Sequence, residues 1–262
     1  MIDMLFVSLE VSLAVLAVLA VSPLLMRRYS RKWRYWVWLL FAVRLMIPYR
    51  LELPAAPVSV SVPEIITVTT VTEEGAEPLG EALQEPGARA ESETVRVQND
   101  ETRRAIDVRS AGIFVWAAGA AAFFGVHTAA YMVFRRRVKP DLVHESEHVY
   151  RCARIESPVL VGFIKPMIIL PEADYSDEER EIIVKHELTH WQRRDMWYKL
   201  VLLIANSVHW FNPIVYVMVR RANADLEYTC DDAVVRGSDA EYRKLYSMVI
   251  LKTMGSVKRR NR

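Results

Sequence analysis

Apolar residues are concentrated in three blocks of this sequence. Residues 4–26 are apolar almost throughout, residues 33–49 combine apolar residues with several tryptophans, and residues 111–134 are rich in small apolar residues. A helix needs about 20 predominantly apolar residues to cross a bilayer. The pattern therefore predicts three transmembrane helices, at about 4–26, 33–49 and 111–134.

The first two blocks each have an alternative interpretation. A cleaved signal peptide usually opens with a positive region, but here Asp3 precedes the first block and basic residues follow it, which favours a retained span. The second block contains Arg44, and an arginine is costly inside a bilayer, so a buried amphipathic helix is the alternative. The flanking Trp33, Trp36 and Trp38 instead favour a helix at the membrane interface.

Basic residues predict the orientation of the chain. They cluster at 27–34 and at 135–139, and such clusters are retained on the cytoplasmic side of a membrane. We therefore expect a multi-pass protein of the cell membrane with its N-terminus outside. Residues 50–110 would form an extracellular loop, and residues 135–262 would form a cytoplasmic domain.

The predicted extracellular loop is rich in Pro, Glu, Val and Thr and poor in aromatic residues. Such a composition buries little apolar surface, so we expect the loop to be largely flexible. A short strand at residues 65–71 is the exception.

The C-terminal half alternates between strand and helix patterns. Residues 158–171 predict two short strands around a turn near 162–166. Ser176 and Glu179 form a capping box that starts a helix. Further helices are expected at residues 196–211, 214–236 and 240–254, which together predict a small α+β domain.

Composition narrows the class of protein. The sequence is 52% hydrophobic and 25% charged, which suggests apolar blocks joined to a polar domain. A net charge of +2 is too small to indicate direct nucleic acid binding. Two cysteines, Cys152 and Cys230, do not form a disulfide framework.

The strongest chemical signal is the motif His186-Glu187-Leu188-Thr189-His190. Two histidines four residues apart lie on one helix face, so both imidazoles can reach one metal ion. Glu187 is then placed to accept a proton from the attacking water. Apolar residues surround this motif and supply material for a partly desolvated cavity.

A second match to the same pattern runs from His144 to His148. Its middle positions are polar and no apolar residues surround it. We interpret it as a solvated surface rather than a metal site.

Glu227 lies on a separate predicted helix, where it can act as a third ligand. Asp231, one turn further on, can accept a hydrogen bond from a ligand imidazole and fix its tautomer. Two histidines and one glutamate leave a coordination position open for water, as in catalytic zinc sites. Asp225 and Asp232 lie nearby on the same predicted helix, so the acidic pair at the site could be shifted along the helix. Cys230 is interpreted as a small buried residue.

The chain resembles the BlaR/MecR family of membrane metallopeptidases, the gluzincin part of β-lactam sensor-transducers. Four segments carry the resemblance in order, namely residues 44–48, 157–171, 186–190 and 227–231. The resemblance implies that zinc binds His186, His190 and Glu227, with Glu187 as catalytic acid/base and Asp231 supporting a ligand. It also implies cleavage of protein substrates inside the cell, in the best-known members leading to loss of a transcriptional repressor.

The resemblance has one departure. The sensor-transducers continue into an extracellular penicillin-binding domain, whereas no Ser-x-x-Lys nucleophile in such a domain is present here. Either the chain is a fragment, or another stimulus is sensed through the loop after Arg50 or through a partner.

The sequence thus predicts a mostly α-helical integral membrane protein with a cytoplasmic-face, zincin-like α+β metallopeptidase domain that contains a small β-hairpin. Its predicted function is zinc-dependent (Zn²⁺) cleavage of protein substrates in signal transduction and regulation of gene expression. The alternative is a non-catalytic membrane transducer with a structural metal site. Expected partners are a protein substrate, with a cytoplasmic transcriptional repressor as candidate, the lipid bilayer, and a second copy of the chain. Tyr228, His209 and nearby arginines are unranked candidates for the oxyanion donor.

Overall fold

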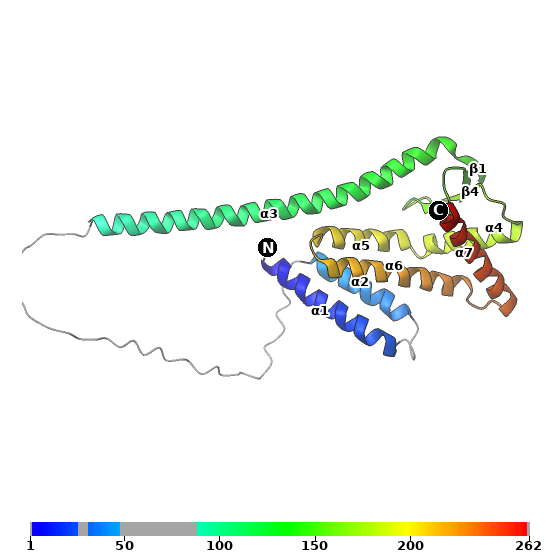
Figure 1. The fold of residues 1–262 in the computed structure, drawn as a ribbon, viewed down its shortest axis with the longest axis horizontal. Helices are drawn as coiled ribbons and strands as arrows, with labels where there is room; N and C mark the ends of the chain where they lie inside the picture. The colour runs from blue at the N-terminus through cyan, green and yellow to red at the C-terminus, as the bar shows by residue number, and fades with distance from the viewer. Residues whose placement is uncertain (1, 26–30, 48–87, 261–262) are drawn as a thin grey trace, which may run out of the picture. The chain divides into compact units, whose positions relative to one another are not determined.

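The structure, a computed structural model, describes residues 2–25, 31–47 and 88–260 (Figure 1). It is mostly helical with a small mixed sheet, as predicted. The elements in chain order are helices α1 (Ile2–Leu25), α2 (Lys32–Met46) and α3 (Ala88–Val138), the short 3-10 helix η1 (Lys139–Asp141), strands β1 (Val143–Ser146), β2 (Val149–Cys152), β3 (Val159–Val161) and β4 (Met167–Pro171), and helices α4 (Asp177–Gln192), α5 (Asp195–Val208), α6 (Pro213–Val234) and α7 (Ala240–Arg260).

Two of the three predicted spans meet the length and composition of a membrane-crossing helix within the described residues. They are Met4–Leu24 in α1 and Ser110–Asp141, which comprises the end of α3 and η1. The second predicted span corresponds to α2, whose 15 residues extend about 22 Å. That is shorter than a hydrocarbon core of about 30 Å, so α2 is not among the candidate spans.

The predicted loop at 50–110 is only partly described. Residues 48–87, including the predicted strand at 65–71, lie outside the described residues. Helix α3 begins at Ala88, well before the predicted start of the third span. Residues 88–110 contain many strong helix formers, Ala, Glu and Arg, so the helix extends beyond the apolar block.

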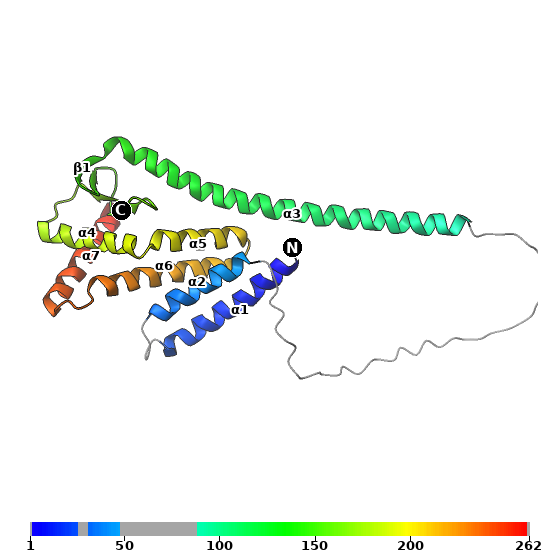
Figure 2. The same ribbon diagram turned by 180° about the vertical axis from the view of Figure 1, so that it is seen from behind.

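Helices α1, α2, α5 and α6 lie side by side and share one apolar core (Figures 1 and 2). One side of α1 is buried there, while its leucines at 5, 9 and 13 are exposed. A helix that is apolar on all sides is typical of a membrane environment. The buried residues of this core are Val7, Val11, Val15, Trp38, Ala42, Leu45, Tyr198, Leu202, Ala205, Val215, Met218, Ala222 and Leu226.

A buried polar cluster joins α1, α2 and α6 inside this core. Asp225 is 1% exposed and forms an ion pair with Arg34, which also donates to Ser22. Trp38 Nε1 donates to the second carboxylate oxygen of Asp225 at 2.8 Å. Both oxygens of this carboxylate therefore have partners, which offsets the cost of burying its charge.

The four-stranded sheet has the order β1-β2-β4-β3, with β2 parallel to β4 and the other pairs antiparallel. The predicted hairpin is confirmed as β3 and β4. Its turn contains Gly162 at φ +106°, where a side chain would collide with the carbonyl oxygen of Lys165. Strand β3 forms one edge of the sheet.

His144 and His148 lie on β1 and in the following turn, and both are exposed. The interpretation of this second motif as a solvated surface is confirmed. The capping box is also confirmed, because Glu179 N donates to Ser176 Oγ and Ser176 N donates to Glu179 Oε2. It starts α4, the helix that carries His186-Glu187-Leu188-Thr189-His190.

A second core packs α4 against α6, α7 and the sheet. Ile182 and Ile183 of α4 belong to the same buried cluster as Cys230 of α6 and Tyr246 of α7. The packing places one face of the motif helix opposite the C-terminal half of α6.

Replacing Asp225 by alanine should lower the free energy of unfolding by about 3–5 kcal/mol, because the half-buried Arg34 then lacks its ion-pair partner. Asp232→Ala is the matched control on the same helix, since Asp232 is exposed, and it should change stability by less than about 0.5 kcal/mol. Unfolding of the purified protein in detergent measures both. Equal effects of the two substitutions would contradict the structural role of Asp225.

Candidate metal centre

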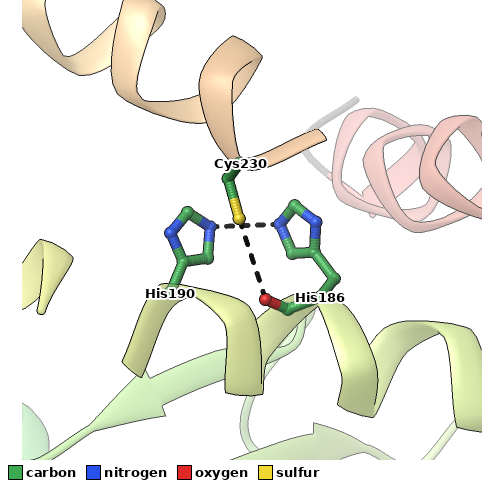
Figure 3. A group of neighbouring side chains, drawn as sticks. All are labelled: His186, His190 and Cys230. Carbon is green, nitrogen blue, oxygen red and sulfur yellow. Dashed lines mark hydrogen bonds between the residues drawn. The ribbon is translucent and has the colours of Figure 1, made fainter. Parts of the chain in front are cut away.

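His186 and His190 lie one turn apart on the face of α4 that packs on α6. His190 is buried and His186 is half-buried. Their Nε2 atoms lie 3.1 Å apart (Figure 3). Two imidazoles therefore present the same ring atom to one point between the helices.

Helix α6 offers two further ligand atoms to this point. Glu227 Oε2 lies 3.1 Å from His190 Nε2. The Cys230 thiol belongs to a cluster with both histidines whose ligand atoms all lie within 4.8 Å of one another. Glu227 and Cys230 are three residues apart, so they occupy adjacent turns on one face of α6. The sequence analysis interpreted Cys230 as a small buried residue. Its position beside both histidines makes it an alternative to Glu227 as the third metal ligand.

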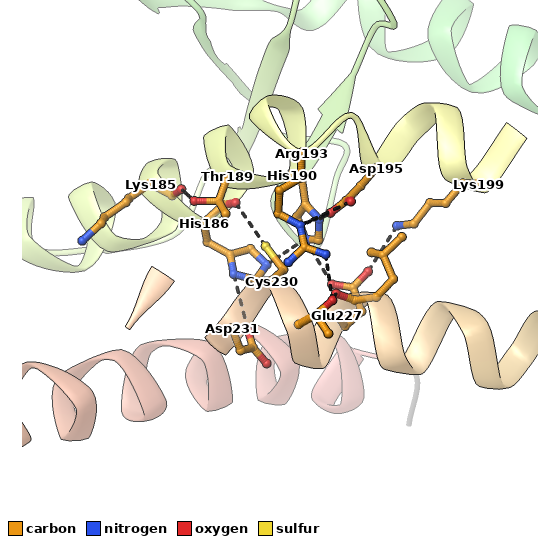
Figure 4. Close-up of polar contacts among 12 residues, drawn as sticks. Lys185, His186, Thr189, His190, Arg193, Asp195, Lys199, Glu227, Cys230 and Asp231 are labelled. Carbon is orange, nitrogen blue, oxygen red and sulfur yellow. Dashed lines mark hydrogen bonds and ion pairs between the residues drawn. The ribbon is translucent and has the colours of Figure 1, made fainter. Parts of the chain in front are cut away.

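Asp195 orients His190. Its Oδ2 atom lies 2.7 Å from His190 Nδ1, and the carboxylate is 1% exposed (Figure 4). Asp195 starts α5 directly after Arg194, whose φ of 60° turns the chain sharply between α4 and α5. Arg193 contacts Asp195 from the other side and donates to Thr229 of α6. With Nδ1–H directed to Asp195, the Nε2 lone pair of His190 is available to a metal ion.

Tyr246 of α7 orients His186. Its hydroxyl lies 2.8 Å from His186 Nδ1 and donates to Asp231 Oδ1 at 2.6 Å. Asp231 itself lies 3.6 Å from His186 Nδ1, so it contacts this imidazole mainly through the tyrosine. Burial and the neighbouring His190 lower the pKa of His186, which favours the neutral ring that a metal requires.

Charges around His190 and Glu227 are strongly coupled. Burial opposes protonation of His190, but hydrogen bonds with Asp195, Cys230 and Glu227 outweigh it and raise its pKa to about 12. Burial also disfavours the Glu227 carboxylate, yet hydrogen bonds from His190 and Lys199 lower its pKa to about 2. A positive charge between His190 and Glu227 is therefore stabilised. A metal ion would compete with the proton for the Nε2 lone pair of His190.

Glu187 faces two cavities beside the histidines. The cavities have volumes of about 370 and 240 Å³, and both include Glu187 and Glu227 in their walls. Burial raises the pKa of Glu187, and the nearby charge of His190 and a hydrogen bond with the Leu160 backbone act in the opposite direction. A carboxyl group with a raised pKa is suited to accept and return a proton near neutral pH.

Two residues considered from the sequence as oxyanion donors lie away from this site. Tyr228 is 47% exposed and its ring stacks under Arg31. His209 is buried at the opposite end of α5 from Asp195, with Nε2 3.0 Å from the carbonyl oxygen of Leu45.

A shift of the acidic pair along the helix is not supported by the geometry either. Asp225 forms its ion pair with Arg34 in the other core, and Asp232 is exposed. Lys199 is a charged residue at the site that the sequence did not indicate. Its Nζ atom lies 3.2 Å from Glu227 Oε1.

The donor set fits a zinc ion. Tetrahedral zinc with Zn–N bonds of 2.0–2.1 Å holds neighbouring nitrogen ligands about 3.3 Å apart. The two Nε2 atoms, at 3.1 Å, are close to this spacing. Each Nδ1 atom has a hydrogen-bond partner, as is usual for metal-ligating histidines.

Apolar helices long enough to cross a membrane, combined with an HExxH helix facing an acidic residue of a second helix, are typical of membrane metallopeptidases. The family model of the BlaR1 peptidase M56 family matches residues 2–261 of this chain. The chain therefore belongs to the BlaR1 peptidase M56 family, and the resemblance predicted from the sequence is confirmed.

Several characterised proteins are similar to this chain. Regulatory protein BlaR1 of Bacillus licheniformis is 36% identical over 119 residues, which is 45% of this chain and 20% of the relative. The methicillin resistance mecR1 protein of Staphylococcus aureus is 29% identical over 103 residues, 38% of this chain and 18% of the relative. Regulatory protein BlaR1 of S. aureus is 22% identical over 129 residues, 48% of this chain and 21% of the relative. These matches span about a fifth of each relative's length.

Glu227→Gln and Cys230→Ala distinguish the two possible third ligands. With Glu227 as ligand, the glutamine variant should lose bound zinc, whereas Cys230→Ala should retain one ion per chain. Metal analysis of the purified variants measures this, with circular dichroism as a control for folding. Loss of zinc from the Cys230 variant alone would assign the thiol instead.

Asp195→Asn should weaken zinc binding by about 10–100-fold, because the uncharged amide no longer raises the basicity of His190. Competition with a chelator of known affinity measures the change. Asp232→Asn removes an exposed carboxylate from the same domain and should leave the affinity unchanged. Unchanged affinity in the Asp195 variant would contradict its role.

Proposed function

We propose that this protein is a zinc-dependent endopeptidase. His186, His190 and Glu227 are the metal ligands, and Glu187 is the catalytic acid/base. The observation that carries the proposal is the convergence of both Nε2 atoms and the Glu227 carboxylate beside cavities that Glu187 also lines.

Glu227 is the better third ligand because of where it faces. It lines both cavities, whereas Cys230 lines neither of them and is 0% exposed. Burial also raises the pKa of the Cys230 thiol, which disfavours the thiolate that binds metals. A metal ion held by His186, His190 and Glu227 would border the cavities that Glu227 lines, where water and substrate could reach it, as a catalytic site requires.

A zinc ion bound here would polarise the scissile carbonyl group and increase the acidity of water at the site. Glu187 accepts the proton of the attacking water and delivers it to the leaving amine. Asp195 and Tyr246 hold the two imidazoles in place during these steps. Lys199 holds one oxygen of Glu227 and directs the other toward His190.

A polypeptide substrate fits the surroundings of Glu187. Edge strand β3 borders the site, and its residues Val159 and Leu160 line the smaller cavity. An extended peptide can add to such an edge as a further strand. A neighbouring cavity of about 430 Å³, lined by Phe163 and Trp197 among others, shares Met196 with the smaller cavity. It is suited to a large apolar side chain of the substrate.

The proposal includes the predicted topology. Helices α1 and α3 supply the two candidate spans. The predicted topology also requires the shorter α2, which packs with α1, α5 and α6, to cross the membrane. The basic clusters at 27–34 and 135–139 favour an active site at the cytoplasmic face.

The names of the relatives support a regulatory role. They are a regulatory protein and a methicillin resistance protein. We infer that this peptidase acts in signal transduction, with a cytoplasmic transcriptional repressor as the candidate substrate. The alternative is a transducer in which the metal only holds α4 and α6 together. A purely structural site has no need of Glu187, which favours the enzyme.

Glu187→Gln should reduce proteolysis by about 10²–10⁴-fold while zinc stays bound, because the variant keeps the ligands and loses the proton acceptor. Mapping new N-termini in the cytoplasmic proteome of cells carrying each form measures cleavage. His186→Ala is the control that loses both zinc and cleavage. Unreduced proteolysis by the Glu187 variant would refute the catalytic assignment. Unchanged signalling by the same variant would favour the alternative, in which the metal only holds α4 and α6 together.

A further inference from the structure

A cavity of about 490 Å³ lies between the C-terminal end of α3 and the sheet. It shares no lining residue with the cavities at His186. Its volume is within the range of about 300–1,000 Å³ that is usual for small-molecule sites. The proposed peptidase reaction makes no use of it.

The lining of this cavity is divided into an apolar part and a cationic part. The sheet contributes Val161, Met167 and Ile169 to the apolar part, and α3 contributes Met132, Phe134 and Val138. The cationic part consists of Arg135, Arg136 and Lys139, all exposed. Among the described residues that line it there is no carboxylate, so the cationic part is suited to an anionic group.

The cavity lies where α3 would leave the bilayer. Its three cations belong to the last part of the candidate span Ser110–Asp141. Met132 and Val133, just before them, are 53% and 44% exposed, which is typical of side chains that face lipid. The cations would then be at the level of the phospholipid head groups, with the apolar wall beside them.

We propose that this cavity binds an anionic phospholipid of the adjacent leaflet. The lipid phosphate lies against Arg135, Arg136 and Lys139, since guanidinium groups donate two parallel hydrogen bonds to phosphate. The first part of an acyl chain lies along Val161, Met167 and Ile169. The inference depends on α3 crossing the membrane and is independent of peptidase activity.

The amphipathic lining is what distinguishes this site from a general basic surface. A polybasic segment attracts anionic lipids through charge alone, and each cation increases the affinity for the lipid about fivefold. General attraction would depend equally on Arg135, Arg136 and Arg137. Arg137 belongs to the same cluster but does not line the cavity, so the two models differ at this residue.

The experiment uses the full chain in nanodiscs of phosphatidylcholine that contain a photoactivatable phosphatidylglycerol. We expect crosslinks in the β4 segment around Met167–Ile169 as well as on α3. Arg135→Gln and Arg136→Gln should each lower the crosslinking yield about fivefold. The matched control Arg137→Gln, which removes the same charge, should change it by less than about twofold.

Three results would overturn the lipid site. Crosslinks confined to α3 would indicate lipid that surrounds the helix without entering the cavity. Equal losses in all three arginine variants would indicate general attraction, and an equal yield with a photoactivatable phosphatidylcholine would exclude selectivity for anionic lipid. Recovery of each variant in the nanodisc fraction separates these results from failure of the membrane topology, and zinc content separates them from failure of the peptidase proposal.

Discussion

The packing of α4 against α6 is the constraint on which the candidate metal centre depends. It brings the two imidazoles of one helix within reach of the Glu227 carboxylate of another, although these residues are distant in sequence. The buried cluster that includes Ile182 and Ile183 of α4 and Cys230 of α6 supports this approach. The proposed ligands are therefore positioned by the packing of two helices and not by neighbouring residues of one segment.

Much of the fold follows from short-range patterns in the sequence. The capping box at Ser176 and Glu179 is a local hydrogen-bonding device, so a few residues suffice to predict where α4 begins. The turn at Gly162 is equally local, because a glycine there avoids a collision that any side chain would make. The helical spacing of His186 and His190 likewise needs no knowledge of the rest of the chain. Glu227 as third ligand remains a proposal, which the contact with His190 supports.

What the sequence did not predict depends on contacts between distant elements. Asp195 is a common helix-starting residue, and only the sharp turn at Arg194 brings it to His190. Tyr246 lies on α7 in an ordinary apolar pattern, and its role depends on the packing of that helix against α4. The same is true of Lys199. Helix α2 ends at Met46, before the end of the apolar block, because Ile47 adopts an extended backbone conformation.

One chain of contacts links α2 to the candidate metal centre. Tyr35 of α2 stacks on Tyr198 of α5 and lies under the guanidinium of Arg193. Arg193 in turn contacts Asp195, the partner of His190. A rotation of α2 about its axis that withdrew Tyr35 would therefore loosen the support of one imidazole. A displacement of α2 would thus reach the His190 imidazole through Arg193 and Asp195 without any movement of the helical part of α4 itself.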